Sequence, residues 1–218
     1  MEEKFIEICR MGDLDRAKKF LRLNPDIKIS ARDDCAFHVV CEYGHLKIAM
    51  WLLQVKPDIK ISACDDYAFR WACDNGHLEV AKWLLQVKPD IDISAKNEFA
   101  FRWACINGHL EVAKWLLHVK PDINISAQND FAFNMVFNRH LYGYYTQLKI
   151  AQWLQTLRPY LYVIEYDKNG NYAGFRIRRK EEANWEKRKC ALHLAYQEET
   201  NILYHLPVDI AKAVTLFV

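Results

Sequence analysis

The chain has 218 residues, of which 30 are lysine or arginine and 28 are aspartate or glutamate, so its formal net charge is +2. A hydrophobic content of 51% with 7 glycines and 6 prolines excludes a disordered or collagen-like chain, and the small net charge does not favour nucleic acid as a partner. The sequence has no apolar run of about 18 residues that could span a membrane and no secretory-signal pattern at its start. We therefore expect an intracellular protein with no membrane attachment, whose 7 cysteines are reduced.

One segment recurs along the chain. Gly-His-Leu-Glu-Val-Ala-Lys-Trp-Leu-Leu occurs at 76–85 and at 108–117, and a close relative occurs at 44–53, each 32 residues after the last. A more polar copy begins at Gly12, and a fifth copy at Leu148 follows an insertion near 141–146. A period of this length is typical of stacked arrays, whose repeats have too little apolar surface to fold alone.

Each repeat is predicted to contain two helices joined by a tight Gly-His turn. Residues 77–87 carry an apolar stripe at helical spacing, and Pro89 ends that helix. A shorter helix around Phe69 and Trp71 precedes it. We expect a residue of the N-cap type to open this shorter helix, followed by an acid in the first turn, where the helix dipole favours negative charge. The predicted caps are Asp33, Asp65, Asn97 and Asn129, and the acids are Asp34, Asp66, Glu98 and Asp130.

Residues 69–85, Phe-Arg-Trp-Ala-Cys-x-Asn-Gly-His-Leu-Glu-Val-Ala-Lys-Trp-Leu-Leu, resemble the core of the ankyrin repeat. The resemblance covers roughly residues 4–159. It implies a mainly α fold, a helical solenoid of five repeats over residues 1–159. It also implies a non-enzymatic scaffold that binds a protein partner on the concave face of the array.

The repeat departs from the family's pattern in two places. The family's Thr-Pro-Leu-His opening appears as Tyr-Ala-Phe-Arg at 67–70, and its histidine is kept only as His38. The spacing also predicts that the β-hairpin finger between repeats is shortened. This form of repeat resembles the ankyrin arrays of large DNA viruses, particularly giant viruses of amoebae, which would imply a viral protein that acts in the host cytoplasm.

The candidate partner-binding surface lies on the first helix of each repeat and at its end. Core residues stay constant between repeats while these positions, which we expect to be exposed, vary; in ankyrin arrays they line the concave face. Solvated residues that touch no partner would vary in the same way. The candidates are His38, Glu42, Tyr43, Arg70, Asp74, Asn75, Arg102, Ile106, Asn107, Asn134, Asn138 and Arg139.

No cofactor, metal site or catalytic group is predicted. A cysteine stands four residues before the turn histidine in three repeats, a spacing that could supply half of a zinc site. These are Cys41, Cys73 and Cys105, before His45, His77 and His109. The position is a small buried one in the ankyrin pattern, and Cys9 occupies it without a following histidine, so a core role is favoured. The repeated tryptophans are predicted to pack between repeats, with partial exposure of Trp71 and Trp103 on the groove allowed.

Residues 160–218 are predicted to form a small α+β cap. Two β-rich runs around Asn169-Gly170 predict a hairpin, and residues 179–197 predict a helix. Seven basic and three acidic residues lie between Arg176 and Lys189. A charged outer face explains this stretch, and the alternative is a subunit of a nucleic-acid-handling assembly.

The last segment, from Leu206, has two interpretations. It predicts a helix that closes the exposed end of the array. It also resembles the opening of an F-box, which would imply a substrate adaptor that recruits a ubiquitin ligase. The residues that carry this resemblance are Leu206, Pro207, Asp209 and Ile210.

Overall fold

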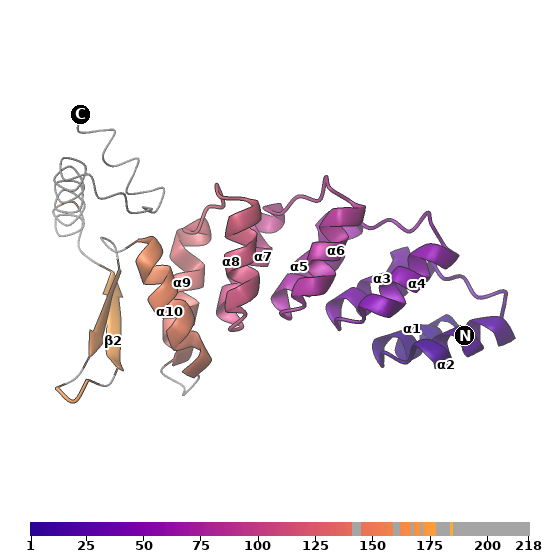
Figure 1. The fold of residues 1–218 in the computed structure, drawn as a ribbon, viewed down its shortest axis with the longest axis horizontal. Helices are drawn as coiled ribbons and strands as arrows, with labels where there is room; N and C mark the ends of the chain where they lie inside the picture. The colour runs from indigo at the N-terminus through magenta and orange to yellow at the C-terminus, as the bar shows by residue number, and fades with distance from the viewer. Residues whose placement is uncertain (141–144, 159–161, 167, 171, 178–183, 185–218) are drawn as a thin grey trace, which may run out of the picture. The chain divides into compact units, whose positions relative to one another are not determined.

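The computed structural model describes residues 1–140, 145–158, 162–166, 168–170, 172–177 and 184. It divides into two compact units, Met1–Met135 and Val136–Val218. In the first unit, helix pairs follow one another along the chain (Figure 1). The helices of this unit are α1 (Glu2–Arg10), α2 (Leu14–Leu23), α3 (Ala31–Glu42), α4 (Leu46–Val55), α5 (Ala63–Asp74), α6 (Leu78–Val87), α7 (Ala95–Ile106), α8 (Leu110–Val119) and the start of α9 (Ala127–His140).

Each repeat begins with a first helix (α1, α3, α5, α7, α9). In this unit the first four repeats also have a second helix (α2, α4, α6, α8). The first helices form one layer, since α1 packs on α3, α3 on α5 and α5 on α7. Residues 56–62, 88–94 and 120–126 return from a second helix to the next first helix as turns, and residues 1–135 contain no β-strand. This arrangement agrees with the shortened finger expected from the sequence.

The Gly-His turn fixes where each second helix begins. At the end of α5, Gly76 has a φ of 79° and the amide of His77 donates to the carbonyl of Ala72 at 2.8 Å, a Schellman motif. The helix that follows, α6, buries Val80 and Leu84 on one stripe. The predicted turn and the helix predicted over 77–87 are confirmed.

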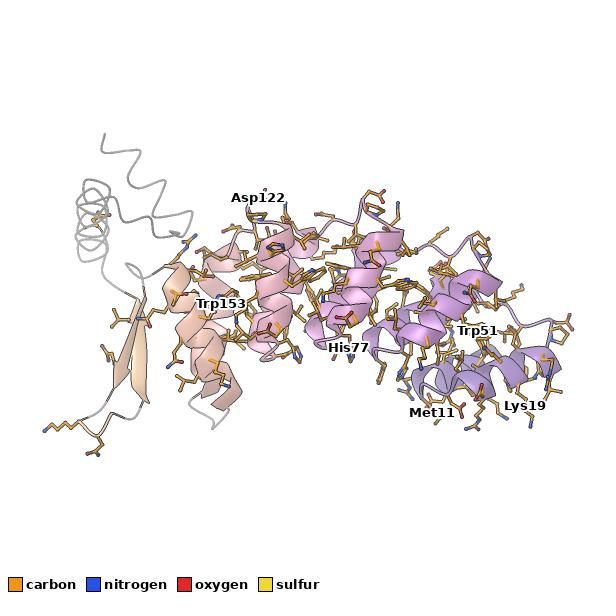
Figure 2. The ribbon with its side chains drawn as sticks, viewed as in Figure 1. Met11, Lys19, Trp51, His77, Asp122 and Trp153 are labelled. Carbon is orange, nitrogen blue, oxygen red and sulfur yellow. The ribbon has the colours of Figure 1, made fainter. Side chains whose placement is uncertain are left out.

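One phenylalanine from each first helix forms the core of the array. These side chains are at most 1% exposed. They are Phe5, Phe37, Phe69, Phe101 and Phe133. The tryptophan of a second helix contacts the phenylalanine of the preceding repeat, with ring centroids 6.3 Å apart for Phe37 and Trp83. Phe69 with Trp115, and Phe5 with Trp51 (labelled in Figure 2), repeat this contact, so the predicted packing between repeats is confirmed at these three tryptophans.

The start of each first helix differs from the prediction. In the four repeats after the first, three consecutive residues have φ between 53° and 62°, so they form a left-handed turn. The left-handed turns are residues 32–34, 64–66, 96–98 and 128–130. Asp33, Asp65 and Asn97 therefore lie inside these turns, while the N-cap positions of α3, α5 and α7 are serines without a side-chain capping bond. The predicted capping role is wrong because the last residue of each turn, and not Asp33, Asp65 or Asn97, directly precedes the right-handed part of the helix.

The acid that ends the left-handed turn bonds to the next repeat at Asp34, Asp66 and Glu98. The carboxylate of Asp34 accepts from the amide of Lys60 at 3.0 Å, and that of Glu98 accepts from the amide of Asn124 at 3.2 Å. Both acids are buried. Their role is to hold the return segment of the following repeat, whereas the sequence suggested stabilisation of a helix dipole.

The second unit contains α10 (Tyr145–Leu157), β1 (Tyr162–Tyr166) and β2 (Tyr172–Ile177). The two strands pair antiparallel, with Val163 opposite Arg176, and Gly170 in the turn has a φ of 80°. The predicted boundary of the array at 159/160 and the helices predicted after residue 178, apart from residue 184, lie outside the described residues, so the cap stays a prediction. None of the helices in the described part of the chain is long and apolar enough to cross a membrane.

Candidate partner-binding surface

A row of half-buried aromatic rings runs across the first helices. We call it the aromatic strip, and its members are Tyr67, Trp71, Phe99, Trp103 and Phe131. Neighbouring ring centroids lie 5.4, 5.9, 5.7 and 6.3 Å apart along this order. Two members come from α5 and two from α7 at i, i+4 spacing, which places them on the same face of each helix. Stacking of the first helices therefore joins the rings into one continuous surface.

Two arginines lie beneath the aromatic strip. The guanidinium of Arg70 is 4.8 Å from the ring centroid of Phe99, and that of Arg102 is 5.3 Å from the ring centroid of Phe131. Each arginine also donates from Nε, at 2.7 Å, to a carbonyl of the left-handed turn in its own repeat, Asp65 for one and Asn97 for the other. Each arginine therefore donates a hydrogen bond to a carbonyl of the turn and makes a cation–π contact with a ring of the strip at the same time.

Five of the candidate partner-binding residues are buried within the array. They are His38, Arg70, Asp74, Arg102 and Ile106, each at most 7% exposed. This is contrary to the exposure expected from the sequence. The neighbouring repeat contacts these positions: the side-chain amide of Asn107 donates to the carboxylate of Asp74 at 2.9 Å, and the ring of His38 lies 5.3 Å from that of Tyr67.

Four further candidates reach the surface of the first unit or are half-buried there. Glu42 is half-buried and accepts a hydrogen bond from the hydroxyl of Tyr67 at 3.1 Å. Tyr43 is 45% exposed, Asn75 is exposed, and Asn107 is half-buried. Glu42 therefore touches the aromatic strip directly.

The last three candidates belong to α9. Asn134 is half-buried and donates to the carbonyl of Asn129 at 3.1 Å. Asn138 and Arg139 lie on α9, and their side chains are outside the described part of the structure. The residues predicted from the sequence do not include Tyr67, Phe99 and Phe131, although each stands 32 residues from the next in a matching position. That regular spacing was the signal that could have found them.

The ankyrin repeat family model, which describes three copies of the repeat, matches residues 5–97 and 37–129, more than half of the chain. The chain belongs to the ankyrin repeat family. No curated protein matches it. The matched residues contain the aromatic strip up to its last ring, Phe131, which lies two residues beyond the match.

The turn histidines of this ankyrin array bridge successive repeats. Nε2 of His45 lies 2.8 Å from the carbonyl oxygen of Arg10 in the preceding repeat. Burial lowers the pKa of His77 and of His109, and their neighbouring histidines lower it further. Figure 2 labels His77 at this turn. The imidazoles of His77 and His109 are therefore neutral near pH 7.

The buried cysteines of the ankyrin array are inert core residues. Burial raises the pKa of Cys41, Cys73 and Cys105 well above the usual range of a thiol, which leaves them protonated. Within the ranges that the structure describes, no group of three or more histidine, cysteine, aspartate or glutamate side chains is placed to hold a metal ion.

Proposed function

We propose that this ankyrin array is a non-enzymatic scaffold that binds a protein partner along the aromatic strip. Ankyrin repeats are protein-interaction modules, and the strip is the feature of this array that fits such a role best. Half-buried tryptophan and tyrosine rings supply large contact areas with few rotatable bonds, and these residue types are enriched at binding hot spots. The strip corresponds to the first helices that line the concave face in the ankyrin pattern.

The rigidity of the strip supports the proposal. Trp71 contacts rings on both sides, at 5.4 Å from Tyr67 and 5.9 Å from Phe99. Arg70 and Arg102 hold two of the rings from below. Because these side chains are ordered before a partner arrives, association costs little side-chain entropy.

The test compares partner capture by the full chain with capture by two variants. The strip variant carries Trp71→Ser and Trp103→Ser, and the matched control carries Met50→Ser and Val87→Ser, two exposed apolar residues of second helices. Proteins recovered from cells by affinity purification are identified by mass spectrometry, and thermal melting confirms that each variant is folded. We expect the strip variant to lose partners that the control retains. Equal recovery by both variants would contradict the proposal.

The two functions predicted for the tail stay predictions. The F-box-like residues Leu206, Pro207, Asp209 and Ile210 lie outside the described residues, as do the basic residues after Ile177. A ubiquitin-ligase adaptor and a nucleic-acid-handling subunit are therefore alternatives that rest on the sequence alone. The same holds for the expected viral origin and for action in the host cytoplasm.

A further inference from the structure

Contacts within the array indicate which chemical groups pack against the rings of the aromatic strip. At two junctions between repeats, a guanidinium packs against a ring of the strip, from Arg70 to Phe99 and from Arg102 to Phe131. The residue in the corresponding position one repeat earlier is His38, whose ring lies 5.3 Å from that of Tyr67. Burial lowers the pKa of His38 from its ordinary value of 6.5, so the imidazole is neutral at pH 7. Tyr67 therefore contacts both this neutral imidazole and the guanidinium of Arg70, which is 6.0 Å from its ring centroid.

His38 does not supply the positive charge that Arg70 and Arg102 supply at the corresponding position of the later repeats. Its side chain is 7% exposed and its Nε2 atom is buried without a hydrogen-bond partner. The neighbouring acids Asp33 and Asp34 raise its pKa against the larger effect of burial. Since the imidazole stays neutral, the negative charge of those acids is not balanced by this residue, unlike in the repeats that carry arginine here.

Acidic residues gather on the helices at this end of the strip. α3 and α5 together carry six acidic and two basic side chains, although the whole chain has a net charge of +2. The acids are Asp33, Asp34, Glu42, Asp65, Asp66 and Asp74, and the bases are Arg32 and Arg70. Arg32 pairs with Glu3, which lies on α1, and Asp65 pairs with Lys96 at 2.6 Å.

The carboxylate of Glu42 lies beside the aromatic strip. This carboxylate accepts a hydrogen bond from the hydroxyl of Tyr67 at 3.1 Å, and none of the ion pairs in the described part of the chain joins it to a basic side chain. A carboxylate has about four acceptor positions, so this hydrogen bond leaves capacity for a further donor. The strip also ends here, because Cys35 and Val39 stand where Tyr67 and Trp71 stand in the next repeat.

We propose that the partner presents an arginine or lysine side chain to the site formed by Glu42, Tyr67 and Trp71, which we call the acidic end of the strip. This inference rests on the proposed function of the strip. The carboxylate of Glu42 receives a charge-assisted hydrogen bond, and the cation packs against the accessible part of the half-buried Tyr67 and Trp71 rings. The apolar part of the partner then lies along Phe99, Trp103 and Phe131. An acidic segment would instead meet like charge, which disfavours it.

The experiment selects random linear peptides displayed on phage against the full chain. We expect the selected peptides to contain arginine or lysine. Replacement of that residue by glutamine in a synthetic peptide weakens binding to the unaltered chain about tenfold, the loss expected for one cation contact at a half-exposed site. The same replacement has little effect on binding to Glu42→Gln, because the variant has already lost the interaction. The matched control Glu79→Gln, an exposed acid on α6, binds as the unaltered chain does.

The outcomes separate this inference from the proposed function. One outcome is that peptides bind Trp103→Ala less tightly, but their affinity changes neither with Glu42→Gln nor when their own basic residues are replaced by glutamine. This outcome would overturn the inference and leave the strip as a binding surface. Selected peptides that bind Trp103→Ala and Glu42→Gln unchanged, or a selection that yields no binder, would overturn both. Thermal melting of Trp103→Ala verifies that it is folded, and Glu42→Gln tests the inference independently of that variant.

Discussion

The carboxylate of Asp66 accepts a hydrogen bond from the backbone amide of Asp92 at 3.1 Å, across 26 residues of sequence. Asp34 with Lys60 and Glu98 with Asn124 repeat this contact at the same separation. A turn of one repeat is thereby fixed to the return segment of the next. The stacking that presents the aromatic strip therefore depends on polar contacts as well as on the phenylalanine core.

We expect Asp66→Ala to destabilise the array. Removal of the carboxylate leaves the amide of Asp92 without this acceptor, a loss of about 1–3 kcal/mol in the free energy of unfolding. Asp65→Ala is the matched control, because its residue lies in the same left-handed turn but is exposed and pairs only with Lys96. Denaturant unfolding of both variants measures the difference, and an equal loss in the two would contradict the role given to Asp66.

A core substitution should cost more than a strip substitution of the same kind. Phe69 is fully buried and contacts Trp115, so Phe69→Ala is expected to lose about 3–5 kcal/mol. Phe99 is half-buried, and Phe99→Ala should lose distinctly less. Chemical denaturation compares the free energies of unfolding of the two variants. A larger loss for Phe99→Ala would show that the aromatic strip, rather than the row of buried phenylalanines, forms the core.

Gly44 is expected to be intolerant of a side chain because of the histidine of the next repeat. Its φ is 78°, and an added Cβ would lie 2.5 Å from Nδ1 of His77. Gly44→Ala therefore combines a left-handed backbone cost of about 1–2 kcal/mol with a collision against the ring. In the background of His77→Ala the collision disappears, so the cost of Gly44→Ala should fall. Additive effects in this double-mutant cycle, measured by thermal unfolding, would refute the contact.

Stability should fall on mild acidification. The folded pKa of His77, of His109 and of His38 lies below the ordinary 6.5, so the unfolded chain binds these protons first. Their contribution is fully present above pH 6.5 and is lost as the pH falls through the folded pKa values. Denaturant midpoints at about pH 7.5 and about pH 5.5 measure the loss. His109→Gln should reduce this pH dependence, and an unchanged slope would argue against the histidine mechanism.

The sequence predicted the features that depend on local spacing. The Gly-His turn at Gly76, the second helix after it and the contact of Trp83 with Phe37 all follow from a fixed period and a helical stripe. The left-handed turns could not be found in this way. Cys64 and Lys96 begin two of them, and neither residue type favours positive φ, so no single position signals the conformation.

The candidate site was predicted less well than the fold. Variation between repeats indicated exposure at Arg70 and Asp74, but both side chains turn inward to satisfy polar groups of the array. Arg70 donates to a backbone carbonyl five residues earlier, and Asp74 accepts from the side-chain amide of Asn107 in the next repeat. Such contacts depend on how the repeats stack, which a helical pattern does not specify.

Site-specific photocrosslinking tests the central claim most directly. A p-benzoylphenylalanine placed at Phe99 keeps an aromatic ring in the strip, and one placed at Val87 marks an exposed position on a second helix. With the full chain expressed in cells and irradiated, we predict that a partner protein is crosslinked from position 99 and not from position 87. Crosslinks formed from position 87 alone would contradict the assignment of the aromatic strip as the binding surface.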